Sequence, residues 1–110
     1  MQIANFDEFA KAKTISNNAQ DAFIAKCLAA AENGDDGAFF DLGVAFSTGM
    51  HGLECDLIEA HKWFNLAAAR GHEDAAYCRG DISDEMTARE IAEAQRRARQ
   101  WLCSSASRAA

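Results

Sequence analysis

Proline is absent from this sequence of 110 residues, and β-branched aliphatic residues are scarce, with one valine and six isoleucines. Because strands are enriched in β-branched residues, this scarcity argues against a sheet protein. Alanine, the strongest helix former, is abundant instead, and no proline interrupts a helical pattern. The sequence also has no apolar run of about 18 residues, the length that a membrane-spanning helix needs. We therefore predict an all-α protein and no membrane partner.

Basic residues are fewer than acidic residues, and the difference is concentrated in the first half of the chain. The formal net charge is −6. Residues 1–60 contain ten acidic and three basic residues, whereas residues 61–110 contain seven acidic and eight basic residues. An acidic surface repels nucleic acid and anionic lipid. The sequence therefore predicts no nucleic-acid partner, and its acidic half favours a partner with basic or amphipathic character.

The four cysteines and three histidines do not follow a metal-binding pattern. Zinc sites favour closely spaced pairs of ligands, and the nearest combinations here are His51 with Cys55 and His72 with Cys78. The start of the sequence lacks the basic residues and the following apolar block that are typical of a signal peptide. We expect reduced thiols in a cytoplasmic protein, with Cys27 and Cys78 filling small gaps in the core, and neither a metal nor a cofactor.

One segment of the sequence recurs after 37 residues. Residues 30–43 (AAENGDDGAFFDLG) correspond to residues 67–80 (AAARGHEDAAYCRG). Glycines and alanines match at several positions, and two further pairs keep their character, Asp36 with Glu73 and Phe40 with Tyr77. A period of this length is typical of helical-repeat proteins, which stack pairs of helices and present their surface to partners.

Capping residues and glycines divide the sequence into six predicted helices. Helix ends are expected at Gly34, Gly49 and Gly71. Helix starts are expected at Asp56 and at the capping box that Thr87 forms with Glu90. With their caps included, the predicted helices are a short one around residues 3–9, then 19–33, 35–49, 56–71, 73–81 and 87–103.

Short connections pair the six helices into about three antiparallel hairpins, which we expect to stack as an α/α solenoid. The predicted domain covers residues 1–103. It consists of a degenerate hairpin at 1–34, the main repeat at 35–71 and a C-terminal capping hairpin at 72–103. Residues 104–110 are expected to fray.

Several side chains of the repeat have environments that the sequence predicts. Phe39 and Phe40 are neighbours about 100° apart around a helix, so they cannot both face the same core. Leu42 is replaced by Arg79 in the second copy, so we expect Arg79 at an exposed end of the stack or paired with a carboxylate. Trp101 is expected to pack in the core against the fourth predicted helix.

The last predicted helix carries four arginines, which raises the alternative of nucleic-acid binding: Arg89, Arg96, Arg97 and Arg99. Glu93 precedes Arg96 and Arg97 by three and four residues, and Glu85 precedes Arg89 by four. Residues at these spacings are neighbours on a helix surface. We therefore expect a solvated face whose charges neutralise one another.

A pattern of small, aromatic and capping residues runs through residues 30–80. Its members are Ala38, Leu42, Gly43, Phe46, Gly49, Gly52, Asp56, Ala60, Trp63, Ala67, Ala68 and Gly71. This pattern resembles the Sel-one-like repeat family, which is related to the tetratricopeptide repeat. The resemblance implies a bacterial protein that folds as a tetratricopeptide-like right-handed superhelix and acts as an adaptor or scaffold.

By tetratricopeptide geometry, the first helix of each pair would line a concave surface that binds a protein or peptide. Residues at helical spacing on that surface are Phe40, Val44, Ser47, Tyr77 and Asp81. We expect the aromatic residues to anchor the partner and Asp81 to set its orientation, without a catalytic residue. Other functions stay open at this point: a small-ligand binder, a hydrolase of penicillin-type compounds as among some secreted family members, or a self-assembling structural protein.

Overall fold

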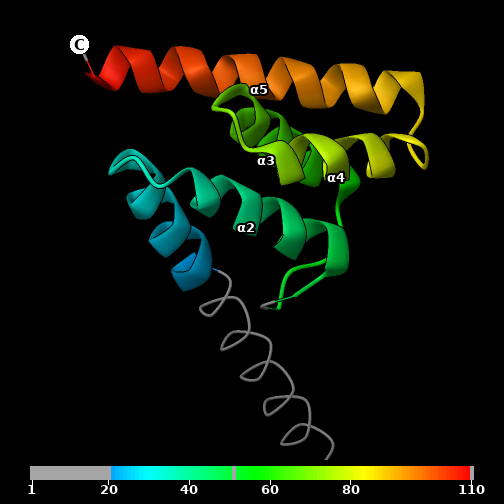
Figure 1. Cartoon of the computed structure of the whole chain (residues 1–110), viewed down its shortest axis with the longest axis horizontal. Coiled ribbons are helices and arrows are strands. Elements are labelled where there is room, and N and C mark those ends of the chain that lie inside the picture. Colours follow the sequence, from blue (N-terminus) through cyan, green and yellow to red (C-terminus); the bar gives the residue numbers. More distant parts are fainter. Residues whose placement is uncertain (1–20, 51, 110) are drawn as a thin grey trace, which may run out of the picture.

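Helices make up all of the regular secondary structure in the part of the chain that is described. The computed structural model describes residues 21–50 and 52–109, and no strand occurs among them. A helical segment at residues 21–32 is followed by four further helices (Figure 1): α2 (Asp36–Thr48), α3 (Leu57–Ala69), α4 (Glu73–Ser83) and α5 (Ala88–Ala109). The all-α prediction is confirmed. The helix expected around residues 3–9 lies outside the described residues.

The predicted caps fix where α3 and α5 start. The carboxylate of Asp56 accepts hydrogen bonds from the backbone N–H groups of Ile58 and Glu59 at 3.1 and 3.2 Å. At α5 the bonding is reciprocal, because Glu90 N–H donates to the Thr87 hydroxyl at 3.1 Å and Thr87 N–H donates to the Glu90 carboxylate at 2.8 Å. Each cap satisfies N–H groups that the first turn of a helix leaves without a backbone partner.

The 37-residue repeat of the sequence is also present in the backbone. Gly34 and Gly71 adopt left-handed φ angles of 95° and 94°. Two backbone hydrogen bonds close each turn, and they join equivalent residues in the two copies. In the first copy, the N–H groups of Gly34 and Asp35 donate to the carbonyls of Ala31 and Ala30, respectively. In the second copy, the N–H groups of Gly71 and His72 donate to the carbonyls of Ala68 and Ala67. This is the Schellman arrangement, whose left-handed residue is most easily a glycine. The helices α2 and α4 that follow start at equivalent positions.

The central helix of the described fold is α3, which packs against α2, α4 and α5. Three aromatic rings join the layers. Phe39 of α2 stacks on Trp63 of α3 with ring centroids 5.8 Å apart, and Trp101 of α5 meets them edge-on at 5.2 and 5.9 Å. This confirms that Trp101 packs against the helix predicted as fourth. Figure 1 shows α5 lying across α3 and α4, with α2 on the opposite side.

Small residues let α2 and α3 approach closely. A Cβ atom on Gly43 would lie 2.5 Å from the ring of Phe64, closer than real Cβ atoms come to other side chains. Ala38 and Ala60 are also buried on these two helices. At the equivalent position in α4, a Cβ atom on Gly80 would have no neighbour within 4 Å, so α4 is not held to another helix at that point.

Three details differ from the sequence-based predictions. Helix α5 extends to Ala109 instead of fraying after residue 103, because no glycine or proline follows to end it. Arg79 is half-buried and donates to the amide oxygen of Asn65 at 2.6 Å, so its partner is not the expected carboxylate. The expected pair of Glu85 with Arg89 does not form, because Glu85 lies in the turn before α5 rather than on the helix.

Candidate partner-binding surface

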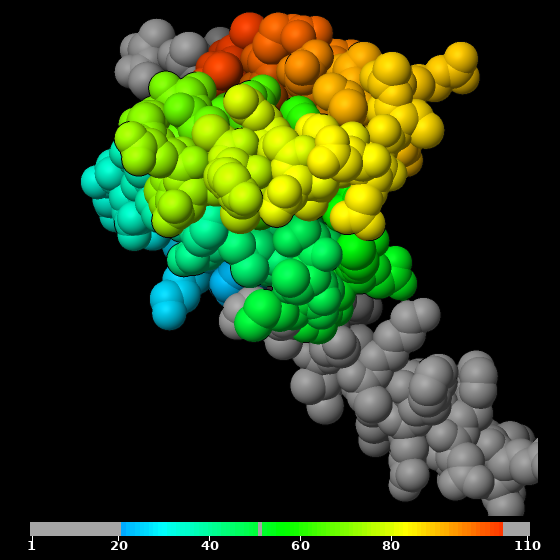
Figure 2. Space-filling view, turned by 45° about the vertical axis from the view of Figure 1, so that its right-hand side comes forward, coloured from blue at the N-terminus to red at the C-terminus, as the bar shows by residue number. Residues whose placement is uncertain are grey.

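The outer side of α4 combines one aromatic ring with several carboxylates. Tyr77 is 75% exposed, more than any other large hydrophobic residue in the described part of the chain. Asp74, Asp81 and Asp84 are also exposed, at three residues before and four and seven residues after Tyr77. These spacings place all four on one side of a helix. We call these four residues the α4 face, which lies between α5 and α2 on the molecular surface (Figure 2).

Two carboxylates of the α4 face, Asp81 and Asp84, lie at the C-terminal end of α4, where negative charge destabilises a helix. The C-terminus of a helix carries a partial negative charge, so anions there are unfavourable. Asp81 lies near this end and Asp84 is the C-cap, and the last turn of α4 contains no basic residue. The one arginine of α4, Arg79, bonds to Asn65 of α3. The helix dipole therefore gives no stabilising role to these two carboxylates.

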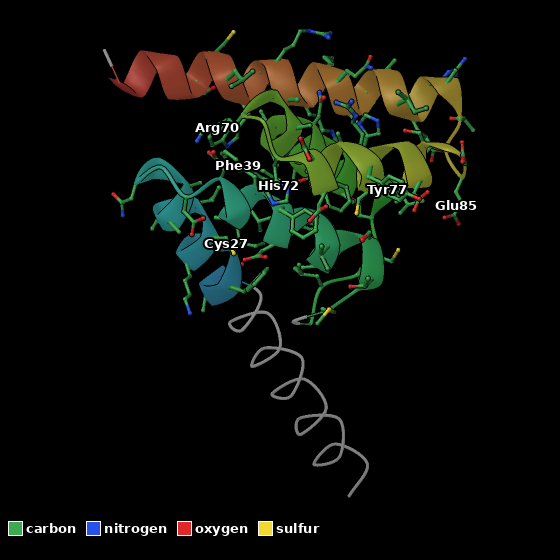
Figure 3. The ribbon with its side chains drawn as sticks, in the orientation of Figure 1. Cys27, Phe39, Arg70, His72, Tyr77 and Glu85 are labelled. Atoms are coloured by element: carbon green, nitrogen blue, oxygen red, sulfur yellow. The ribbon has the colours of Figure 1, made fainter. Side chains whose placement is uncertain are left out.

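Phe40 is less available than Tyr77, its counterpart in the repeat. Its ring stacks on the imidazole of His72 with centroids 4.6 Å apart and lies 5.7 Å from the ring of Phe64. Its neighbour Phe39 is fully buried. The two neighbours therefore face different surroundings, as helix geometry requires. Phe40 thus packs against His72, the N-cap of α4 that Figure 3 labels, and its removal would disturb the fold there.

His72 has a structural role that the sequence analysis missed. Its Nδ1 atom accepts a hydrogen bond from the backbone N–H of Ala75 at 3.1 Å and so caps α4. Asp35 caps α2 in the same way, accepting from Gly37 N–H at 3.0 Å. The repeat contained the signal, because it aligns His72 with Asp35.

The remaining predicted site residues lie on α2. Val44 lines a hollow of about 410 Å³ together with Phe40, between the helical segment 21–32 and α2. The hydroxyl of Ser47 donates to the carbonyl of Val44 at 3.0 Å, so it is engaged within its own helix. The structure thus places Tyr77 and Asp81 together on the α4 face, and Phe40 and Val44 together at the hollow.

Charges between α3 and α5 neutralise one another. Glu93 accepts hydrogen bonds from Arg96 at 2.8 Å and from Arg97 at 2.7 Å, which confirms the predicted pairing. Arg97 also pairs with Glu59 of α3 at 2.8 Å. The hydrogen bonds from Arg96 and then Arg97 lower the pKa of Glu93 to about 2. These two guanidinium groups are therefore already occupied by carboxylates, which weakens any case for a phosphate-binding surface here.

The thiols of Cys27 and Cys78 pack in the core or against it. Burial, and next the charge of Asp41, raises the pKa of the Cys27 thiol. Burial, and next Asp81, raises the pKa of Cys78. Raised values disfavour the thiolate that a nucleophilic cysteine needs. Nowhere in residues 21–50 and 52–109 do three or more His, Cys, Asp or Glu side chains gather as metal ligands.

No described helix is both long enough and apolar enough to cross a membrane. Comparison with protein-family models, with curated proteins and with solved structures finds no match to this chain. The resemblance to Sel-one-like repeats therefore stays a prediction. The case for a function depends on the α4 face and on the packing that presents it.

Proposed function

We propose that the protein is a non-catalytic interaction module, an adaptor that binds a basic segment of a protein partner at the α4 face. The observation that carries the proposal is the exposed ring of Tyr77 between Asp74 and Asp81. A Lys or Arg side chain can lie over such a ring while its charged end pairs with a neighbouring carboxylate. Tyrosine is enriched among the few residues that supply most of the binding energy of an interface.

The repeated helix connections support a solenoid-like role for these helices. In a tetratricopeptide-like stack, α2 and α4 would be the first helices of successive pairs and would face the partner together. Solenoids of this kind use an extended surface rather than a closed pocket to bind other chains. Under this proposal Tyr77 and Asp81 make direct contacts, while Phe40 supports the start of α4 through His72.

Affinity capture with matched variants tests the proposal. The protein and three variants, Tyr77→Ala, Asp81→Asn and Met50→Ala, would each be used to capture proteins from cell extract, with quantification by mass spectrometry. Met50 is a suitable control because it is 50% exposed and lies on the connection after α2. We expect Tyr77→Ala to reduce capture of a specific partner about tenfold, and Asp81→Asn to reduce it less and in a salt-dependent way.

Circular dichroism of each variant shows whether the helices are intact. The proposal is wrong if Tyr77→Ala keeps its helical content and captures the same proteins, in the same amounts, as the unaltered protein and Met50→Ala.

A further inference from the structure

A second hollow, with a volume of about 670 Å³, lies where the ends of several helices meet. Its apolar wall comes from the helical segment 21–32, the end of α2, the connection after it and the start of α3: Ile24, Phe46, Leu53, Leu57 and Ile58. All of these except Leu53 are only half-buried, so apolar surface stays open to solvent. The volume is within the range of about 300–1,000 Å³ that is usual for ligand sites.

Negative charge surrounds this apolar wall. The hollow is also lined by Glu54, Asp56, Glu85 and Glu90, and no Lys, Arg or His is among its described lining residues. We call it the acidic groove. Asp56 and Glu90 are held in place by the caps of α3 and α5. Glu54 and Glu85 are exposed and form no ion pair with a described residue, so they are available to a ligand.

The charges of the groove exclude an anionic ligand. The start of α3 would otherwise attract an anion, but Asp56 already occupies its first N–H groups. Glu54 lies on the connection before α3, between Leu53 and Leu57 of the apolar wall, and Glu85 lies in the turn before α5. Opposite charge at the rim steers and orients a partner, while the apolar wall supplies the area that binding needs.

We infer that the acidic groove docks a cationic amphipathic helix of a protein partner. Apolar side chains of that helix would cover Phe46 and Ile58, and its Lys or Arg side chains would reach Glu54 and Glu85. A helix brings residues three and four apart to one side, which lets apolar and cationic groups enter the groove together. The inference rests on the proposed function only in taking the partner to be a protein, because the groove is a different surface from the α4 face.

Backbone-amide NMR with a defined probe tests this inference. The probe is a blocked peptide of ~18 residues of Leu, Lys and Ala, in which the leucines form one helical side and the lysines flank it. Two control peptides keep the length: one carries Glu in place of Lys, and one has the same composition in an order that spreads leucine around the helix. The expected result is a shift of the amide resonances of residues 53–58 and 85–90 with the probe, and with neither control.

Variants separate the groove from the α4 face. We expect Glu54→Gln with Glu85→Gln to weaken probe binding about fivefold at low salt, and Ile58→Arg to abolish it. Ile58 suits this change because it is not part of the buried core cluster. The matched control is Asp41→Asn with Glu73→Gln, which makes the same change in net charge at two exposed positions outside both the groove and the α4 face and should leave probe affinity unchanged.

Each outcome decides the inference. Shifts confined to residues 74–81, or weakening by Asp74→Asn with Asp81→Asn instead of the groove pair, would overturn the groove while supporting the α4 face. Absence of binding up to millimolar peptide would overturn the groove and leave the separate capture test of the α4 face unaffected. If the probe shifts the amide resonances of residues 53–58 and 85–90 equally in the unaltered protein and in Tyr77→Ala, the groove is established as a separate binding surface. This conclusion does not depend on the result of the capture test.

Discussion

Residues at equivalent positions of the 37-residue repeat can have different surroundings in the fold. Gly43 and Gly80 are equivalent, yet a Cβ on Gly43 would lie 2.5 Å from the Phe64 ring and a Cβ on Gly80 would meet nothing within 4 Å. Both glycines lie inside helices, where alanine is the better helix former. Opposite effects are therefore expected from the same substitution at the two positions.

Gly43→Ala should lower the free energy of unfolding by about 1–3 kcal/mol, because overpacking outweighs the gain in helix propensity. Gly80→Ala should raise it by about 0.5–1 kcal/mol, because only the propensity changes. Urea denaturation followed by circular dichroism measures both. Equal effects of the two substitutions would contradict the close approach of α2 and α3 at Gly43.

His61 should make the fold sensitive to mild acid. It is 3% exposed, and burial, followed by the charge of Arg79, lowers the pKa of its imidazole. The unfolded chain then binds a proton that the folded chain does not, so the contribution of His61 is complete above about pH 6.5 and is lost as the pH falls below it. The slope from this group is at most about 1.4 kcal/mol per pH unit.

Replacing His61 isolates this contribution. The free energy of unfolding of His61→Leu should depend less on pH than that of the unaltered protein between about pH 5 and 7, where the reference imidazole titrates. Denaturation curves at several pH values give the comparison. Parallel pH profiles for the two proteins would show that His61 is not held neutral by the fold.

At the scale of helices, α4 is the element in which stability and the proposed function conflict. Its last turn has Asp81 and no basic residue, so its charges oppose the helix dipole. Asp81→Lys should raise the free energy of unfolding by about 0.5–1 kcal/mol and also abolish partner capture. Thermal denaturation and the capture assay measure the two effects. A variant that is more stable and still binds would remove Asp81 from the proposed surface.

Helix boundaries were the most predictable part of the fold because their signals are local. Asp56 and the Thr87–Glu90 box cap the helices as predicted, since capping depends on residues three positions apart. The end of α5 was missed because the tail has no residue that stops a helix.

Side-chain partners were less predictable, because they depend on how helices cross. The sequence showed that Phe39 and Phe40 must diverge, but only the packing of Trp63, Trp101 and His72 decides which of the two is fully buried. Arg79 was expected to need a carboxylate, and the amide of Asn65 lies within its reach instead. The acidic groove was missed entirely, since its walls come from segments far apart in the sequence.

At the scale of the whole molecule, the described helices present two acidic surfaces around one core. The core is formed where α2, α4 and α5 pack on α3, and the rings of Phe39, Trp63 and Trp101 meet there. The α4 face and the acidic groove lie outside this core, and Glu85 of the groove follows Asp84 of the face directly in the chain. A single basic partner could contact both surfaces, which would raise the overall affinity through linked binding.

Site-specific photo-crosslinking tests the central claim, binding through the α4 face, most directly. A photoreactive phenylalanine analogue would replace Tyr77 in one protein and Ala92, an exposed residue of α5, in another. In cells or in extract, we predict a discrete crosslinked partner from position 77 that disappears when Asp81→Lys is added, and no such product from position 92. Equal crosslinking from the two positions, or none from position 77, would contradict the account.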